Sequence, residues 1–265
     1  ASIAGVSTGE VTEETASSLT ATGTLTITDV DTGEAVFVAQ TNTAGSAGLG
    51  TFNLGTNGAW TYAASNTNAT IQALGTGETT TDTFTAVSAD GTTQVVTVTI
   101  TGVNDTASIA GDASGAVTEE DDASLLTANG TLTITDVDTD EAVFVAQTDT
   151  DGGAGLGVFN LGTDGAWSYA ADNTNATIQA LGTGDTTTDT FTAVSADGTT
   201  QVVTVTITGV NDTAVIAGVT TGAVTEEDAA SLTASGTLTI SDVDTDEAVF
   251  VAQTDTDGGA GLGVF

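Results

Sequence analysis

The sequence predicts an all-β protein built of tandem antiparallel β-sandwich domains with Greek-key connections, about seven strands in each. One observation is the alternation of apolar residues with threonine, as in residues 92–102, where Val96, Val98 and Ile100 are separated by threonines. This period of two is typical of a strand with one dry and one wet face. A second observation is that the whole pattern repeats along the chain, with Asn104 and Asn211 lying 107 residues apart.

Three motifs define the repeat. Gly-Val-Asn-Asp occupies 102–105 and 209–212, Val-Thr-Glu-Glu begins at Val11, Val117 and Val224, and Gly-Thr-Leu-Thr-Ile begins at Gly23, Gly130 and Gly236. The period is far longer than the 20–50 residues of a solenoid coil and close to one β-sandwich domain of about 100 residues. We therefore expect one domain at 1–106, a second at 107–213, and the truncated N-terminal half of a third at 214–265.

The elements of the first repeat follow from the same pattern. In chain order the expected strands are a short segment near 1–4, another around 10–13, and the segments 23–29, 35–40, 51–55, 59–63, 82–90 and 92–102. Asn57-Gly58 and Asp90-Gly91 precede strands and are typical of tight hairpin turns. Residues 68–75 lack the alternation and predict a short helical turn. Trp60 and Tyr62 lie on one face of a strand, which predicts a place in the core.

The charge composition excludes several classes of function. The chain has 36 acidic residues and no lysine, arginine or histidine, so its net charge is -36. Nucleic-acid binding requires cationic side chains, so we expect no binding of nucleic acid. A polyanion without a long apolar run is not expected to enter a membrane. Without histidine, cysteine or lysine the usual nucleophile and base pairs of enzymes are absent, so we expect no catalysis.

Acidic residues are expected to gather where two repeats join. The first repeat contributes the linker residues Asn104 and Asp105, and the second contributes Asp136 and Asp138 at the end of a strand. Further candidates there are Glu78, Asp82, Glu119 and Glu120. Neighbouring carboxylates repel one another, and the chain has no side-chain cation to cancel the repulsion. Ligation by oxygens alone in a loose geometry is what Ca²⁺ prefers, whereas Mg²⁺ demands a tighter octahedron. The sequence therefore predicts bound calcium.

The run of residues 87–105, the Val-Thr-Glu-Glu motif and Leu-Thr-Ile-Thr-Asp-Val-Asp-Thr together resemble a cadherin-like module, and most closely the VCBS-type repeats of large bacterial RTX-type surface adhesins. The resemblance covers the whole chain and implies immunoglobulin-like (cadherin-like) sandwiches that hold Ca²⁺ between domains. At the first junction it implicates Asn104, Asp105, Glu119 or Glu120, Asp136 and Asp138. At the second junction it implicates Asn211, Asp212, Glu226 or Glu227, Asp242 and Asp244.

The chain departs from the cadherin pattern in its linkers. Gly102 stands where cadherins have the first linker aspartate, and Thr106 replaces the second asparagine, so we expect fewer ions per junction than in cadherins. The acidic segment of cadherins is matched only loosely, by Glu78, Asp82, Asp185 and Asp189. The equivalent positions of the first repeat, Glu13, Glu14, Asp29 and Asp31, complete the candidate metal ligands.

These features predict calcium-rigidified spacer repeats of an exported bacterial adhesin or surface fibre. The expected partners are neighbouring repeats of the same chain, and like chains if a fibre forms; an adhesive target would lie outside this segment. One alternative is a subunit of a self-assembling extracellular filament. Another is a carbohydrate-binding sandwich, which requires exposed aromatic residues. The segments 148–153 and 254–259 read Thr-Asp-Thr-Asp-Gly-Gly, which is compatible with a second calcium loop or with a polar turn.

Overall fold

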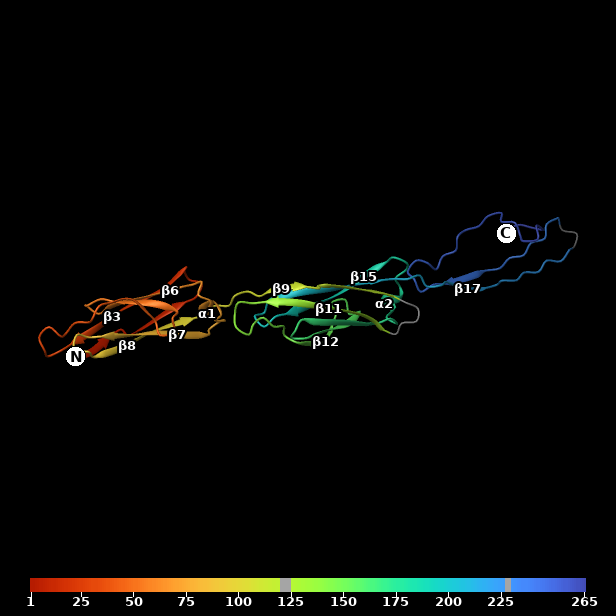
Figure 1. The fold of residues 1–265 in the computed structure, drawn as a ribbon. Coiled ribbons are helices and arrows are strands. Elements are labelled where there is room, and N and C mark those ends of the chain that lie inside the picture. The colour runs from red at the N-terminus through yellow and green to blue at the C-terminus, as the bar shows by residue number, and fades with distance from the viewer. Residues whose placement is uncertain (120–124, 227–229) are drawn as a thin grey trace. The chain divides into compact units, whose positions relative to one another are not determined.

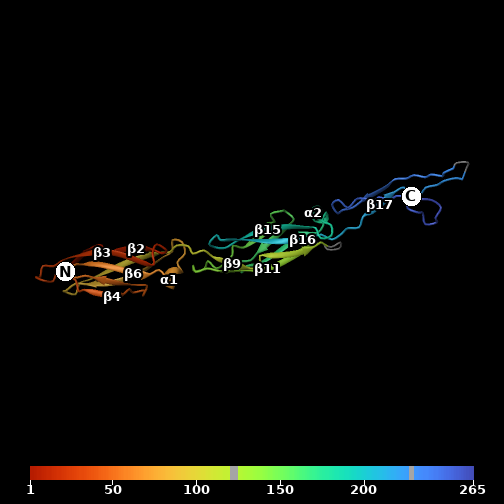
Figure 2. The same ribbon diagram turned by 90° about the horizontal axis from the view of Figure 1, so that it is seen from above.

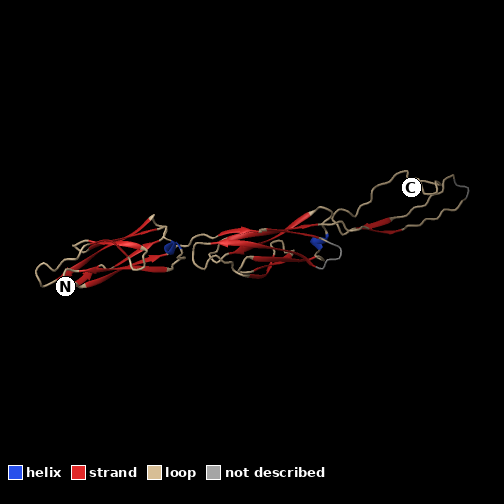
Figure 3. Ribbon diagram, in the orientation of Figure 1, coloured by secondary structure: helices blue, strands red, loops and turns tan. Residues whose placement is uncertain are grey.

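The computed structural model describes residues 1–119, 125–226 and 230–265. The chain divides into two compact units. Unit 1 comprises residues 1–110, 133–144 and 194–200, and unit 2 comprises residues 111–132, 145–193 and 201–265. Strands and loops make up nearly all of the described chain, together with two short helical turns (Figure 3). Within the described residues, no helix is long and apolar enough to cross a bilayer.

Residues 1–106 form strands and one helical turn, as the alternation predicts. These are β1 (Ser2–Gly5), β2 (Thr8–Thr12), β3 (Ser18–Thr28), β4 (Gln40–Ala44), β5 (Gly50–Leu54), β6 (Ala59–Ser65), α1 (Ala69–Gln72), β7 (Thr79–Val87) and β8 (Thr93–Thr101).

The same elements return in the second repeat. They are β9 (Ser108–Gly111), β10 (Ser114–Thr118), β11 (Leu125–Thr135), β12 (Gln147–Asp151), β13 (Gly157–Leu161), β14 (Ala166–Asp172), α2 (Ala176–Gln179), β15 (Thr186–Val194) and β16 (Thr200–Thr208). The described part of the third repeat contains β17 (Val215–Gly218) and β18 (Leu238–Ser241), which pair antiparallel.

Each of the first two repeats is a β-sandwich, so the protein is all-β. In the first repeat, a five-stranded sheet of order β1-β3-β6-β5-β4 faces a three-stranded sheet of order β2-β8-β7 (Figures 1 and 2). The second repeat has the equivalent sheets, β12-β13-β14-β11-β9 and β10-β16-β15. Residues 1–12 supply an edge strand to both sheets of the first sandwich, because β1 pairs with β3 and β2 pairs with β8.

The pairing of β2 with β8 positions the candidate site. These two strands run parallel, with Val11 opposite Ile100 and Thr12 opposite Thr101. Both strands therefore end at the same edge of the sandwich. The residues that follow them, Glu13 and Gly102, emerge side by side, and in the second repeat β10 and β16 are paired in the same way.

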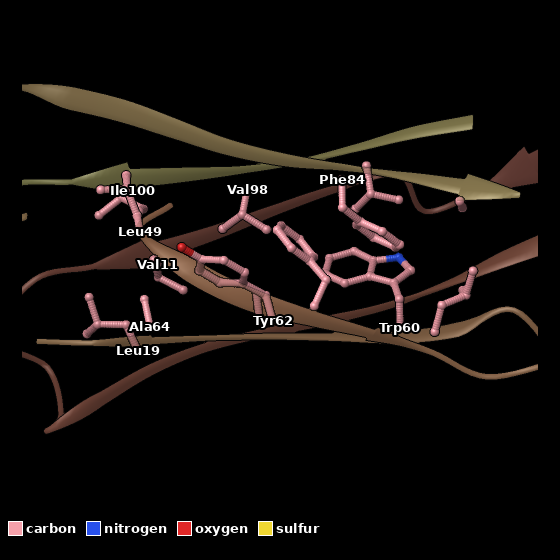
Figure 4. Close-up of a cluster of buried hydrophobic side chains, with 14 of the residues drawn as sticks. Val11, Leu19, Leu49, Trp60, Tyr62, Ala64, Phe84, Val98 and Ile100 are labelled. Carbon is pink, nitrogen blue, oxygen red and sulfur yellow. The ribbon is translucent and has the colours of Figure 1, made fainter. Parts of the chain in front are cut away.

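The core lies between the two sheets and is aromatic at its centre (Figure 4). Trp60 and Tyr62 are each only 1% exposed, which confirms their expected place in the core. The ring of Phe52 lies 4.6 Å from that of Tyr62 and 4.5 Å from that of Phe84, measured between centroids. Buried aromatic rings cannot stack on a sugar, so they do not provide the exposed platform that a carbohydrate-binding sandwich requires.

The structure corrects the expected strand at 35–40. Phe37 makes an isolated bridge to Ser88, and the regular strand β4 begins at Gln40. The pairing of β4 with β5 then shifts register between Gln40 and Thr43, where Asn42 has a positive φ of 47°. The apolar run cannot form a continuous strand here, because its two ends pair with different partners.

The turn predictions are confirmed. Gly58 has a φ of 82°, and a Cβ at this position would lie 2.1 Å from the carbonyl oxygen of Leu25, so only glycine fits. Residues 68–75 contain the helical turn α1, and the side chain of Asn68 caps it by accepting a 2.9 Å hydrogen bond from the Thr70 N–H. Asn68 is thereby fixed at the entrance of α1.

Candidate metal centre

Carboxylates converge where β2 and β8 of the first repeat end. We call this group the first junction cluster. It comprises Glu13, Asp105, Asp136, Asp138 and Glu141, all of which belong to unit 1.

Glu13 is fully buried at this edge of the sandwich. It follows β2 directly, so the parallel pairing with β8 brings it to the linker that follows β8. The backbone N–H of Val103 donates a 3.3 Å hydrogen bond to Oε2 of Glu13, and Nε2 of Gln72 donates to Oε1. Each carboxylate oxygen of Glu13 therefore accepts a hydrogen bond that holds it in place.

The two aspartates of the Asp-Val-Asp motif are oriented by backbone amides. The N–H of Asp105 donates a 2.7 Å hydrogen bond to Oδ2 of Asp138. The N–H of Asp138 in turn donates a 2.9 Å bond to Oδ1 of Asp136, which closes a turn within the motif. These bonds fix one oxygen of each aspartate and leave the other oxygen directed elsewhere.

Several carboxylate oxygens of the cluster are buried without a hydrogen-bond partner among the described residues. Asp138 is only 3% exposed, and its Oδ1 has no partner. The same holds for one oxygen each of Asp105, Asp136 and Glu141. A buried charged oxygen with no partner is costly, since it has lost its water without receiving a compensating bond. These oxygens could accept a bound cation.

The electrostatics of the cluster support the same conclusion. Burial raises the pKa of Glu13, and the charges of Asp105 and Asp138 raise it further. Burial also raises the pKa of Asp105, with additional contributions from Asp138, Glu14 and Asp136. For Glu141, burial is again the first cause of a raised pKa, and the nearby Asp138 is the second. Each carboxylate thus resists ionisation in the presence of the others, and a bound cation would relieve this repulsion.

The turn after α1 makes two contacts with the segment that carries the carboxylates. The N–H and Oγ1 of Thr139 donate to the carbonyl oxygen of Ala73, at 3.1 Å and 2.9 Å. Gly75 lies so close to Glu141 that a Cβ on Gly75 would be 2.5 Å from Oε1. The turn after α1 therefore packs directly on the segment that carries Asp136, Asp138 and Glu141.

The second junction has the same construction within unit 2. Oε1 of Glu119 accepts from Gln179 and its Oε2 accepts from the Val210 N–H at 3.4 Å, while Glu119 is 3% exposed. The N–H of Asp212 donates a 2.8 Å bond to Oδ2 of Asp244, which is also 3% exposed. We call this group the second junction cluster, completed by Asp242 and Glu247.

A third acidic group lies at the other end of the first sandwich. Asp29, Glu34 and Asp90 can each place a carboxylate oxygen within 4.8 Å of the others, and an acidic triad of this kind can bind Ca²⁺. These residues are the sequence equivalents of Asp136, Glu141 and Asp197. The N-terminal ammonium of Ala1 lies 2.7 Å from Asp29 and also contacts Asp90. Asp31 is exposed and donates its N–H to Oδ1 of Asp29 at 2.8 Å.

The structure corrects the predicted place of Glu119. The sequence analysis put it at the first junction, whereas its hydrogen bonds to Val210 and Gln179 put it at the second. The reason is that β10 runs parallel to β16, so the residue after β10 lies beside the linker that leaves its own repeat. Glu13 takes the corresponding place at the first junction. Glu226 is exposed, and Glu120 and Glu227 lie outside the described residues.

The remaining linker candidates lie around the clusters. Asn104 donates its side-chain N–H to the carbonyl oxygen of Asp105 at 2.5 Å, and Asn211 does the same to Asp212. Glu14 is exposed and accepts a 3.1 Å bond from Asn66. Glu78 and Asp185 are exposed, and their charges contribute to the raised pKa values of Glu141 and Glu247, respectively.

Asp82 and Asp189 have a different role from the one expected. Asp82 is fully buried inside the first sandwich, where its oxygens accept hydrogen bonds from the N–H groups of Ala47 at 2.9 Å and Gly50 at 3.0 Å. The hydroxyl of Tyr62 donates to the same carboxylate at 3.3 Å. Asp189 makes the equivalent bonds in the second repeat. Because protein donors already satisfy their oxygens, these aspartates anchor a loop, and we do not include them in the metal centre.

The segment 148–153 was expected to be a calcium loop or a polar turn, but residues 148–151 lie in strand β12, which has a register shift between Gln147 and Thr150. Asp149 and Asp151 are exposed, and the N–H of Asp149 donates a 3.0 Å bond to Oδ1 of Asn160.

Three further residues at these edges, Gln72, Glu141 and Asp197, were not predicted from the sequence. Oδ2 of Asp197 accepts a 3.0 Å bond from the N–H of Ala107, and its Oδ1 accepts one of 3.0 Å from Thr199, so it anchors the chain after the linker. A signal for these residues was present, because each recurs in another repeat, for example as Gln179 and Asp90.

Comparisons with known proteins concern the fold. No protein-family model matches the sequence, and no curated protein matches it either. The chain is similar in structure to the protocadherin gammaB7 EC3-6 cis-dimer structure, with 13% identity over 81% of this chain and a TM-score of 0.47. It is also similar to chicken VE-cadherin EC1-2, with 16% identity over 76% of this chain and 97% of that chain and a TM-score of 0.34.

The matched cadherin structures are often longer than the region they share with this chain. The chain spans 50% of the protocadherin gammaB7 EC3-6 structure and 59% of the protocadherin gamma B7 structure of domains 1-4. The strand order given above shows by itself that the first two repeats are β-sandwiches. Likenesses at these identities and TM-scores add no information about function.

Proposed function

We propose that this chain is a segment of calcium-rigidified spacer repeats from a long extracellular bacterial adhesin or surface fibre. In this proposal Ca²⁺ binds at the junctions between repeats, and the neighbouring repeats of the same chain are the partners. The resemblance of the linker and strand motifs to VCBS-type repeats supports the assignment to a bacterial surface protein.

The observation that carries the proposal is the environment of Asp138. Its side chain is 3% exposed, and Oδ1 has no hydrogen-bond partner among the described residues. Around it lie Asp105, Asp136 and Glu141, and each has one buried carboxylate oxygen that also lacks a hydrogen-bond partner among the described residues. No lysine, arginine or histidine exists anywhere in the sequence to neutralise them. A metal cation from solution would do so while the carboxylates stay ionised.

The donor set fits calcium. The candidate ligand atoms described above are carboxylate oxygens, and Ca²⁺ takes six to eight oxygen ligands in flexible arrangements. Asp105, Asp136, Asp138 and Glu141 would hold the ion, with Glu13 at its border. When bound, the ion supplies positive charge that cancels the mutual repulsion of these groups.

The mechanical role follows from where the ligands originate. Glu13 and Asp105 belong to the first sandwich and its linker, whereas Asp136, Asp138 and Glu141 follow a strand of the second repeat. An ion bound by both sets opposes bending at the Gly-Val-Asn-Asp linker, because bending would separate ligand from metal. Extracellular calcium modules bind with dissociation constants of about 10⁻⁴–10⁻³ M. Such sites fill in a calcium-rich exterior, which supports export.

Small-angle scattering tests the proposal directly. The maximum dimension and the stiffness of the intact chain should increase in millimolar Ca²⁺ relative to EGTA. The double variant Asp136→Asn with Asp138→Asn should reduce this response and lower the calcium stoichiometry, and Asp149→Asn, at an exposed position of β12, serves as the control. Identical scattering with and without calcium would exclude the stiffening role.

A further inference from the structure

We propose that Gln72, the last residue of α1, is a positioning residue that orients the carboxylate of Glu13 toward the cation of the first junction. This inference rests on the proposed function, since it concerns the same site. It assigns a task to α1, a single helical turn that the sandwich does not need in order to complete either of its sheets.

The contacts of Gln72 are specific to this edge. Its Nε2 donates to Oε1 of Glu13 and, at 3.3 Å, to Oε1 of Glu14. The backbone N–H of Val103 holds the other oxygen of Glu13. Glu13 is fully buried, so these are the donors that fix the plane of its carboxylate. A carboxylate has about four lone-pair sites, which leaves capacity on both oxygens for a cation.

An amide is the suitable side chain for this task. A lysine or arginine at position 72 would place a permanent positive charge beside Glu13 and compete with the metal ion. A glutamate would add another like charge. The neutral amide of Gln72 donates a hydrogen bond and leaves the negative charge of the cluster unchanged, as hydrogen-bond partners of metal-ligating carboxylates generally do.

The same helical end also contacts the other side of the cluster. The carbonyl oxygen of Ala73, the next residue, accepts the two hydrogen bonds from Thr139, which follows Asp138 directly. One rigid turn therefore holds Glu13 through Gln72 and the Asp138 segment through Ala73. The arrangement is repeated at the second junction, where Gln179 donates to Glu119 and the carbonyl of Ala180 accepts from Thr245 at 3.2 Å.

The test is a calcium titration of the full chain followed at each junction separately. Amide resonances of Asp105 and Asp212 report the first and second clusters, because each of these N–H groups bonds to an aspartate of its cluster. Gln72→Met should weaken calcium binding at the first junction about 10- to 100-fold, the range typical for losing a partner that orients a ligand. Binding at the second junction should stay unchanged, and Gln179→Met should give the reverse pattern.

Two further measurements separate positioning from a general loss of stability. Thermal unfolding in EGTA should show that Gln72→Met is folded at the titration temperature, with a modest loss of stability because Oε1 of Glu13 loses a donor. Gln94→Met should leave both affinities unchanged, because the Gln94 side chain donates to the carbonyl oxygen of Val95 at the opposite end of β8. If calcium binds the unaltered chain and Gln72→Met with equal affinity at the first junction, the role of Gln72 is refuted while the proposed function stands. If the unaltered chain binds no calcium, the proposed function itself is refuted.

Discussion

The backbone N–H of Asp105 lies 2.7 Å from Oδ2 of Asp138 and donates a hydrogen bond to it. This bond links Asp105, in the linker after β8, with Asp138, which lies shortly after β11 and 33 positions further along the chain. It also settles which oxygen of Asp138 remains for another ligand, since Oδ2 is occupied and Oδ1 is buried without a partner among the described residues. The backbone thus leaves Oδ1 available to another ligand.

Asp138→Asn should separate metal binding from folding. The variant removes a charged ligand, so calcium affinity at the first junction should fall about tenfold or more, equivalent to about 1.4 kcal/mol. In EGTA the variant should be no less stable than the unaltered chain, because the amide removes like-charge repulsion with Asp105 and Asp136. Thermal unfolding in EGTA and in calcium measures both effects, and Asp244→Asn provides the matched change at the second junction. A loss of stability in EGTA as large as that in calcium would contradict this account.

Gly75→Ala should disturb Glu141 specifically. The new Cβ would lie 2.5 Å from Oε1 of Glu141, too close for contact, so the flexible carboxylate must move away. Calcium affinity at the first junction should fall severalfold with little effect on unfolding in EGTA. The control is a double-mutant cycle with Glu141→Ala: once the carboxylate is gone, Gly75→Ala should have no further effect on affinity. Additive effects would show that the two residues are not coupled.

Removal of calcium should make the stability of the folded chain decline with rising pH. Glu13 and Asp105 have pKa values raised above their ordinary 4.5 and 3.8, so the folded chain retains protons that the unfolded chain has lost. Their contribution to stability is complete below the unfolded pKa and is lost as the pH rises through the folded pKa. In EGTA the melting temperature should therefore decline as the pH rises above about 4.5. Bound calcium should abolish this decline.

Asp197 should make the stability of the folded chain rise with pH in more acidic solution, which is the opposite dependence. Burial alone would raise its pKa, but hydrogen bonds from Ala107, Ser195 and Thr199 lower the pKa below its ordinary 3.8. Its contribution is present above the unfolded pKa and is lost as the pH falls through the folded pKa. Asp197→Asn should flatten the acid limb of a melting curve measured against pH. An unchanged limb would show that other carboxylates determine acid unfolding.

Asp82→Ala should destabilise the fold and leave calcium binding intact. The change removes the acceptor of the Ala47 and Gly50 N–H groups and of the Tyr62 hydroxyl, and leaves buried donors unsatisfied. We expect a loss of about 3 kcal/mol or more in the free energy of unfolding, against about 1 kcal/mol for Tyr62→Phe. Chemical denaturation and calcium titration measure the two properties. A lower calcium affinity of the folded variant would indicate that Asp82 is a calcium ligand.

Much of the fold was predictable because strand periodicity is a local property. The alternation of Val96, Val98 and Ile100 with threonine requires no knowledge of distant residues, and all three are fully buried in the structure. Gly58 and the capping residue Asn68 are also local signals, and both mark the expected turns. The clustering of Asp136 and Asp138 with Asp105 followed from counting which loops share one edge of a sandwich.

The errors concern pairings between distant segments. The place of Glu119 depends on whether β10 runs parallel or antiparallel to its neighbour, and no residue of β10 encodes that choice by itself. Asp82 is similar: an aspartate between threonines resembles a solvated strand residue until the loop that carries Ala47 and Gly50 folds over it. Glu141 was overlooked because its role depends on contact with Gly75, which lies 66 residues away in the chain.

Each copy of the sequence carries a Val-Thr-Glu-Glu segment and an Asp-Val-Asp segment. The first lies at the edge of the sandwich that adjoins the following repeat, and the second lies at the edge that adjoins the preceding repeat. Any copy is therefore a compatible neighbour for any other. Unequal recombination between copies in the gene could lengthen or shorten the array by whole domains without disturbing a junction cluster, so the length of the array can evolve by copy number alone.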